Sequence, residues 1–77
     1  MARTDVTLSL TRDQALVLFE WLSREDEAGR LPITNPAEQR VIWNVEAILE
    51  KALPEPLAAN YDEILAAARL RLTDEKG

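Results

Sequence analysis

The spacing of apolar residues changes near residue 11 and divides the chain into two parts. Val6, Leu8 and Leu10 alternate with polar residues, which is the two-residue period of a half-buried strand. Beyond residue 11 the apolar positions recur every three to four residues, as they do on one face of an α-helix. The pattern predicts a β-strand or an extended arm over 5–10, followed by helices over 12–28, 36–53 and 58–72.

Residues with strong terminal preferences mark the ends of these helices. Thr11 and Gln14 have the spacing of a capping box, and Asn35 followed by Pro36 is typical of a helix start. Glycine is common at the position just after a helix C-terminus, so Gly29 predicts that the first helix ends close to it. Pro54 cannot donate to the preceding turn, so the second helix should end at about residue 53.

The apolar stripe of the first predicted helix is wider than one neighbouring element requires. Leu18 and Leu22 lie at its centre, while Val17 and Trp21 extend it towards the far side. We therefore expect this helix to be covered on two sides. The expected core face of the second helix is Val41, Val45, Ile48, Leu49 and Ala52, and that of the third is Tyr61, Ile64, Leu65, Ala68 and Leu72.

These elements predict a mainly α fold, in which the N-terminal strand or arm precedes a three-helix bundle within a single domain over 1–77. A chain of 77 residues buries only a small core, and it contains no cysteine to add a disulfide. Self-association is a common remedy, so we expect a homodimer. The hypothetical dimer interface comprises Val6, Leu8, Leu10, Val17 and Trp21.

Composition argues against several classes of function. The chain has no histidine and no cysteine, and no nucleophile–base pair can be assembled, so we expect neither an enzyme nor a metal or cofactor site. The longest apolar run, Ala15 to Phe19, is too short for a membrane span, and the N-terminus lacks a signal peptide's apolar segment. We expect a cytoplasmic protein without a membrane partner. The net charge is −5 and the chain has no cluster of basic residues to contact phosphates, so we do not expect it to bind nucleic acid.

An aromatic residue on the polar face of the second helix is the main candidate for partner binding. Trp43 lies there with Arg40 and Ala47, and Trp and Arg are enriched in interface hot spots. The alternative is that the N-terminal arm or the third helix covers Trp43. The acidic run Glu25-Asp26-Glu27 is either the solvated end of the first helix or a site for a cation or a basic partner.

Two segments resemble a group of short uncharacterised bacterial proteins. They run from Leu10 to Leu22 and from Ala37 to Glu50, where the run Ala-Glu-Gln-Arg-Val-Ile-Trp is distinctive, and the stretch from Glu55 to Arg71 is similar too. The resemblance implies a bacterial, stand-alone helical protein. It implies no activity and assigns no functional residues.

The sequence favours a protein–protein interaction module, for example an antitoxin- or immunity-like inhibitor or an adaptor that binds a basic partner. One alternative is a DNA-binding regulator of ribbon-helix-helix type, which also places a strand before two helices. In that fold the outward strand positions carry basic or amide side chains, whereas here they are Asp5, Thr7 and Ser9. A further alternative is a structural subunit of a larger assembly.

Overall fold

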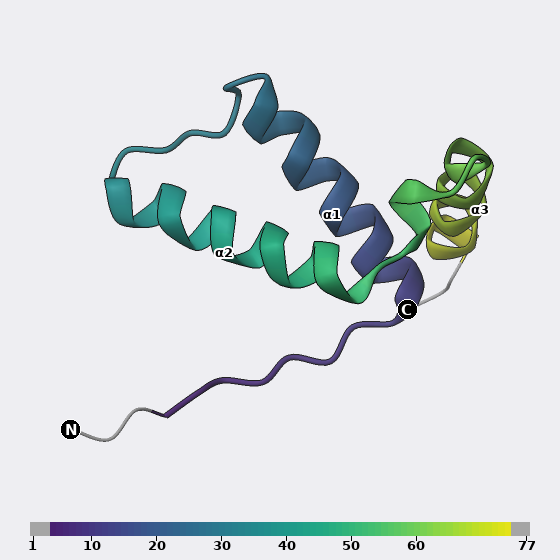
Figure 1. Cartoon of the computed structure of the whole chain (residues 1–77), viewed down its shortest axis with the longest axis horizontal. Coiled ribbons are helices and arrows are strands. Elements are labelled where there is room, and N and C mark those ends of the chain that lie inside the picture. Colours follow the sequence, from purple (N-terminus) through teal and green to yellow (C-terminus); the bar gives the residue numbers. More distant parts are fainter. Residues whose placement is uncertain (1–3, 75–77) are drawn as a thin grey trace.

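The computed structural model describes residues 4–74, which form three α-helices and one short 3₁₀-helix. In chain order these are α1 (Arg12–Glu27), α2 (Pro36–Ala52), η1 (Glu55–Leu57) and α3 (Tyr61–Asp74) (Figure 1). No β-strand occurs between residues 4 and 74. The predicted mainly α architecture with three helices is confirmed.

Local capping interactions start α1 and α2 at the positions that the sequence indicates. The Gln14 amide donates to Thr11 Oγ1 over 3.1 Å, and the Thr11 amide donates to Gln14 Oε1 over 2.9 Å. At α2 the Ala37 amide donates to Asn35 Oδ1 over 2.8 Å, and Glu38 completes a second capping box. Each box satisfies amide groups that have no partner within the helix.

Backbone conformation ends each helix close to its predicted limit. Gly29 follows α1 with φ at 69°, a left-handed conformation in which a side chain would be strained. Leu53, predicted to be the last residue of the second helix, is instead extended (φ −118°, ψ 110°) because Pro54 follows it.

The third helix begins later than predicted. Residues 55–57 form the separate turn η1, and Ala58 is extended with ψ at 145°, so no continuous helix can pass through it. The amides of Glu63 and Ile64 donate to the Asn60 carbonyl, which places the first turn of α3 after residue 60. α3 therefore covers Tyr61–Asp74 rather than 58–72.

Helix α1 is the central element, since both α2 and α3 pack against it (Figure 1). This arrangement agrees with the breadth of its apolar stripe. Leu16 of α1 and Ala68 of α3 are the most deeply buried residues, at 2% and 0% exposure. The other buried apolar residues are Leu22, Leu49, Leu53 and Leu65.

Three residues of the predicted core are not in the core. Val41, Ile48 and Ala52 of α2 are exposed, Ile48 with 67% of its surface accessible. α2 and α3 both pack against α1, but α3 lies beside the N-terminal half of α1 and does not form a second layer over α2 (Figure 1). The apolar face of α2 is therefore wider than the surface that α1 covers.

Polar contacts connect α1 to the C-terminal part of the chain. Arg71 of α3 donates to both oxygens of Asp13, over 2.7 and 2.9 Å, and Arg12 pairs with Glu55 of η1. The Tyr61 hydroxyl donates to Glu20 Oε1 over 3.1 Å, and burial followed by the Glu20 contact raises the pKa of Tyr61 to about 12. These contacts fix the register of α3 along α1.

The segment predicted to be a strand or an extended arm has no regular secondary structure. Residues 4–10 run beside α2 before they enter α1 (Figure 1). Within residues 4–74 this segment has no strand partner. None of the helices in that range is long and apolar enough to cross a bilayer.

Candidate protein-binding cleft

A cleft of about 450 Å³ lies between the second half of α1 and the middle of α2. Helical periodicity places four residues of each helix on its walls, since side chains three or four positions apart share a face. The residues from α1 are Phe19, Ser23, Asp26 and Glu27, and those from α2 are Trp43, Glu46, Ala47 and Glu50. Two aromatic side chains, Phe19 and Trp43, and four carboxylates therefore line the same cleft.

Two hydrogen bonds join the helices across the cleft and set their register. Gln39 Nε2 donates to Asp26 Oδ1 over 3.0 Å, and Ser23 Oγ donates to Glu46 Oε1 over 3.5 Å. As the α1 residue number falls from 26 to 23, its α2 partner rises from 39 to 46, as expected for antiparallel helices. These contacts hold Asp26 and Glu46 at the cleft wall.

Glu46 is the least satisfied polar side chain of the cleft. Its second oxygen, Oε2, is buried and has no hydrogen-bond partner among residues 4–74. Burial raises the pKa of Glu46 above its ordinary value, and the neighbouring Asp26 raises it further. Glu46 therefore has an unused acceptor in a site where a positive charge would favour its ionised form.

Trp43 forms the aromatic part of the same wall. Its side chain is 58% exposed, so neither the N-terminal segment nor α3 covers it in the described chain. Ala47 lies one turn further along α2 and also lines the cleft. Arg40, the third residue of the predicted partner-binding set, is exposed about one turn before Trp43 and does not line the cleft.

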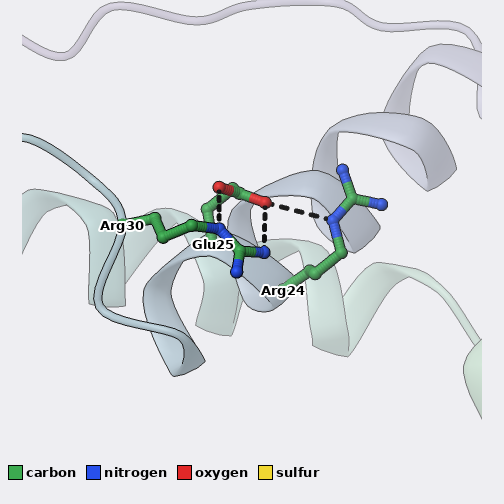
Figure 2. Close-up of polar contacts among 3 residues, drawn as sticks. All are labelled: Arg24, Glu25 and Arg30. Carbon is green, nitrogen blue, oxygen red and sulfur yellow. Dashed lines mark hydrogen bonds and ion pairs between the residues drawn. The ribbon is translucent and has the colours of Figure 1, made fainter.

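The neighbouring acid Glu25 belongs to a different local arrangement. Its two oxygens accept from Arg30 over 2.8 and 3.0 Å, and one of them also accepts from Arg24 over 3.2 Å (Figure 2). The Arg30 contact, followed by that of Arg24, lowers the pKa of Glu25 to about 2. Within the acidic run Glu25-Asp26-Glu27, Glu25 forms an ion pair with Arg30 just beyond the end of α1. Asp26 and Glu27 line the cleft.

The residues of the hypothetical dimer interface do not form one continuous surface. Val6, Leu8 and Leu10 line an apolar groove beside α1 and α2. Val17 is partly buried against the core, and Trp21, with 46% of its surface exposed, does not line that groove. The structure thus groups the three N-terminal residues and separates them from the two in α1.

Sequence reasoning did not select Glu46 and Glu50, the α2 carboxylates of the cleft, although the acidic run that contains Asp26 and Glu27 was one possible site for a cation or a basic partner. Glu46 and Glu50 follow Trp43 by three and seven positions, a spacing that places them on the same face of α2. That spacing was the available signal. Which α1 residues lie opposite depends on helix packing, and no local pattern encodes it.

The acidic cleft does not have the arrangement of a metal centre. No group of three or more His, Cys, Asp or Glu side chains between residues 4 and 74 is placed to hold a metal ion. Comparison of the chain with protein-family models, with curated proteins and with solved structures gave no match. The geometry of the cleft is therefore the basis on which a function can be proposed.

Proposed function

We propose that this chain is a protein–protein interaction module whose cleft binds a basic segment of another protein. The observation that carries the proposal is the placement of exposed Trp43 beside Glu46, whose buried Oε2 has no partner among the described residues. An arginine or lysine side chain fits both features, because its charged end donates hydrogen bonds while its cationic group is attracted to an aromatic face.

Binding of a cation would relieve the electrostatic cost of the cleft. Four carboxylates share its walls, and repulsion from Asp26 adds to the effect of burial in raising the pKa of Glu46. A guanidinium group would offset this repulsion and favour the ionised form of Glu46. Arginine is favoured over lysine, since its planar fork can contact a carboxylate and stack on Trp43 at the same time.

The charge of the whole chain supports the same class of partner. A net charge of −5 attracts basic surfaces over distances of about a Debye length, and such attraction raises the association rate. The concrete form of the proposal is an antitoxin- or immunity-like inhibitor, or an adaptor, that covers a basic surface of its target.

The two alternative functions predict different behaviour. A DNA-binding regulator needs cationic groups that face phosphates, whereas the carboxylates of the cleft repel them. A structural subunit of a larger assembly needs no specific affinity for basic peptides. No observation in the structure favours either alternative over the interaction module.

Fluorescence of Trp43 provides a direct test. In a Trp21→Phe background Trp43 is the only tryptophan, so its emission reports the cleft alone. Titration at ~50 mM salt with a nona-arginine peptide should give a saturable change, and a nona-glutamate peptide should give none. Substituting Glu46→Gln should weaken binding by about tenfold, since it removes one charge-assisted hydrogen bond.

Glu63→Gln is the matched control, because Glu63 is exposed on α3 and does not line the cleft. It changes the net charge equally and should leave the dissociation constant within about twofold at this salt concentration. Equal weakening by both substitutions would show that peptide binding depends on overall charge rather than on the cleft. Saturable binding of duplex DNA in place of the basic peptide would instead favour the regulator.

A further inference from the structure

A second depression in the surface, an apolar groove of about 690 Å³, lies between the N-terminal segment and the helices α1 and α2. Among its lining residues only Asp5 carries a charge. The apolar members are Val6, Leu8, Leu10, Ala15, Leu18, Val45, Ile48, Leu49 and Ala52. A groove of this composition is suited to an apolar occupant.

The single chain leaves the apolar side chains of the N-terminal segment in solvent. Val6 is 93% exposed and Leu8 is 76% exposed, although their alternating pattern is typical of a strand with one buried side. No backbone hydrogen bond joins residues 4–10 to the rest of the described chain. The segment therefore offers both an unburied apolar side and unpaired backbone groups, which favour pairing with another strand.

The accessible surface of the chain is large for its mass. It measures 6327 Å², whereas a compact monomer of 8.7 kDa should expose about 4700 Å². The six residues outside the described range can be taken as fully exposed and left out of both the measured surface and the compact reference. Roughly 900 Å² of surplus surface then remains. One partner of a stable interface of standard size buries about 800 Å², so the surplus is sufficient for a dimer.

We propose that the occupant of the groove is a second copy of this chain. The N-terminal segments of the two copies pair as a two-stranded antiparallel ribbon, and its apolar side covers the grooves of both copies. Val6, Leu8 and Leu10 face the helices, while Ser9, which does not line the groove, faces solvent. This inference does not depend on the cleft beside Trp43, which lies on other residues of α1 and α2.

Symmetry determines the direction of the ribbon. In a dimer with a two-fold axis each copy presents the same surface, and a strand that crosses the axis pairs antiparallel with its twin. The exposed Ile48 of α2 then lies under the ribbon instead of in solvent. The surface beside Val17 and Trp21 has no part in this interface.

Size-exclusion chromatography coupled to light scattering tests the proposal, with the whole chain loaded at ~10–300 µM. The chain should elute as a dimer, and Leu8→Lys should weaken the dimer by at least ~100-fold, because symmetry places two lysines in one apolar seam. Ser9→Lys is the matched control: it adds the same charge one residue away, at an exposed position that does not line the groove, and should leave the dimer intact. Helical circular dichroism would establish that each variant is folded.

Each alternative result would overturn the inference. A monomer at ~300 µM would exclude a stable self-associated form. A dimer that persists in Leu8→Lys would have its interface elsewhere. Equal loss in Leu8→Lys and Ser9→Lys would contradict the assignment of one apolar and one solvent-facing side.

Single cysteines provide an independent test of antiparallel pairing, since the natural chain contains none. Cysteine would be placed at one position at a time from residue 5 to residue 9, and formation of the intermolecular disulfide would be followed under mild oxidation. Antiparallel pairing about a two-fold axis predicts a maximum at one position, because only there does a residue lie opposite its twin. Equal rates at all five positions would indicate random collision and would overturn the ribbon.

Discussion

At the scale of single residues, Glu46 combines an energetic cost with a means of binding. Burial and the nearby Asp26 raise its pKa, so the folded protein favours the protonated form more than the unfolded chain does. The contribution of Glu46 to stability is therefore greatest below its unfolded pKa of ~4.3 and is lost as the pH rises through the higher folded value. At neutral pH the ionised side chain opposes folding, and a bound cation would offset this effect.

Glu46→Gln should therefore stabilise the free protein at pH 7. We expect the free energy of unfolding to rise by about 0.5–1 kcal/mol, because the amide removes a buried charge and its acceptor faces Ser23. The gain should shrink as the pH falls through the raised folded pKa of Glu46 and be smallest below ~4.3, where wild-type Glu46 is protonated in both states. Urea denaturation at pH 7 and pH 4 measures the difference, and the exposed Glu50→Gln should change stability by less than ~0.5 kcal/mol. A loss of stability in Glu46→Gln at pH 7 would contradict this account.

Glu25 should show the opposite dependence on pH. Its contacts with Arg30 and Arg24 lower its pKa to about 2, so its stabilising contribution is present above the unfolded value and is lost as the pH falls towards 2. Glu25→Gln should melt a few degrees below wild type at pH 7, and the two proteins should converge near pH 2. Thermal melts monitored by circular dichroism at several pH values test this. Glu27→Gln serves as the neighbouring control. If the melting temperatures of Glu25→Gln and wild type differed by the same amount at every pH, the ion pairs of Glu25 would be ruled out as the cause.

At the scale of elements, the capping box that starts α2 is a local device with a measurable effect. Asn35→Ala removes the acceptor for the Ala37 amide and should lower the free energy of unfolding by about 1 kcal/mol. Asn44→Ala is the matched control, since Asn44 is exposed within α2, where alanine has the higher helix propensity, and it should be neutral or slightly stabilising. Urea midpoints at constant m-value provide the comparison. Equal effects of the two substitutions would show that the cap does not determine the start of α2.

The close approach of α1 and α3 at Ala68 gives a second prediction at this scale. Ala68 is completely buried, so Ala68→Leu should force the helices apart and destabilise the fold by about 1–3 kcal/mol. The same substitution at exposed Ala66, two residues earlier in α3, should change stability by less than ~0.5 kcal/mol. Chemical denaturation of both variants distinguishes the cases. Comparable losses at the two positions would indicate that helix packing is not the determining factor.

The elements also show which features a sequence can predict. Helix starts at Thr11 and Asn35 were predictable because each cap is formed by residues within four positions of one another. The exposure of Ile48 was not predictable from periodicity, since an apolar face does not specify what covers it. The cleft was predictable only in part. Trp43 was a candidate because a tryptophan is unusual on a polar face, but the burial of Glu46 depends on Ser23 and Asp26 of the opposite helix.

At the scale of the whole molecule, surface area connects stability to association. With roughly 900 Å² of surplus surface, a single copy has fewer buried apolar contacts than a compact monomer of the same mass. Burial of the groove in a dimer would supply such contacts, and folding would then be coupled to association. A protein of this kind is stabilised by increasing its own concentration.

The melting temperature should therefore depend on protein concentration. For 77 residues with typical unfolding entropies, coupled dissociation and unfolding should raise the melting temperature by about 4–5 °C for each tenfold increase in concentration. Circular dichroism melts between ~1 and ~100 µM measure this slope. Leu8→Lys should abolish this slope and Ser9→Lys should retain it, because only Leu8 lines the apolar groove. A wild-type melting temperature that does not change with concentration would separate folding from association and would leave the open surface of the single chain as its stable form.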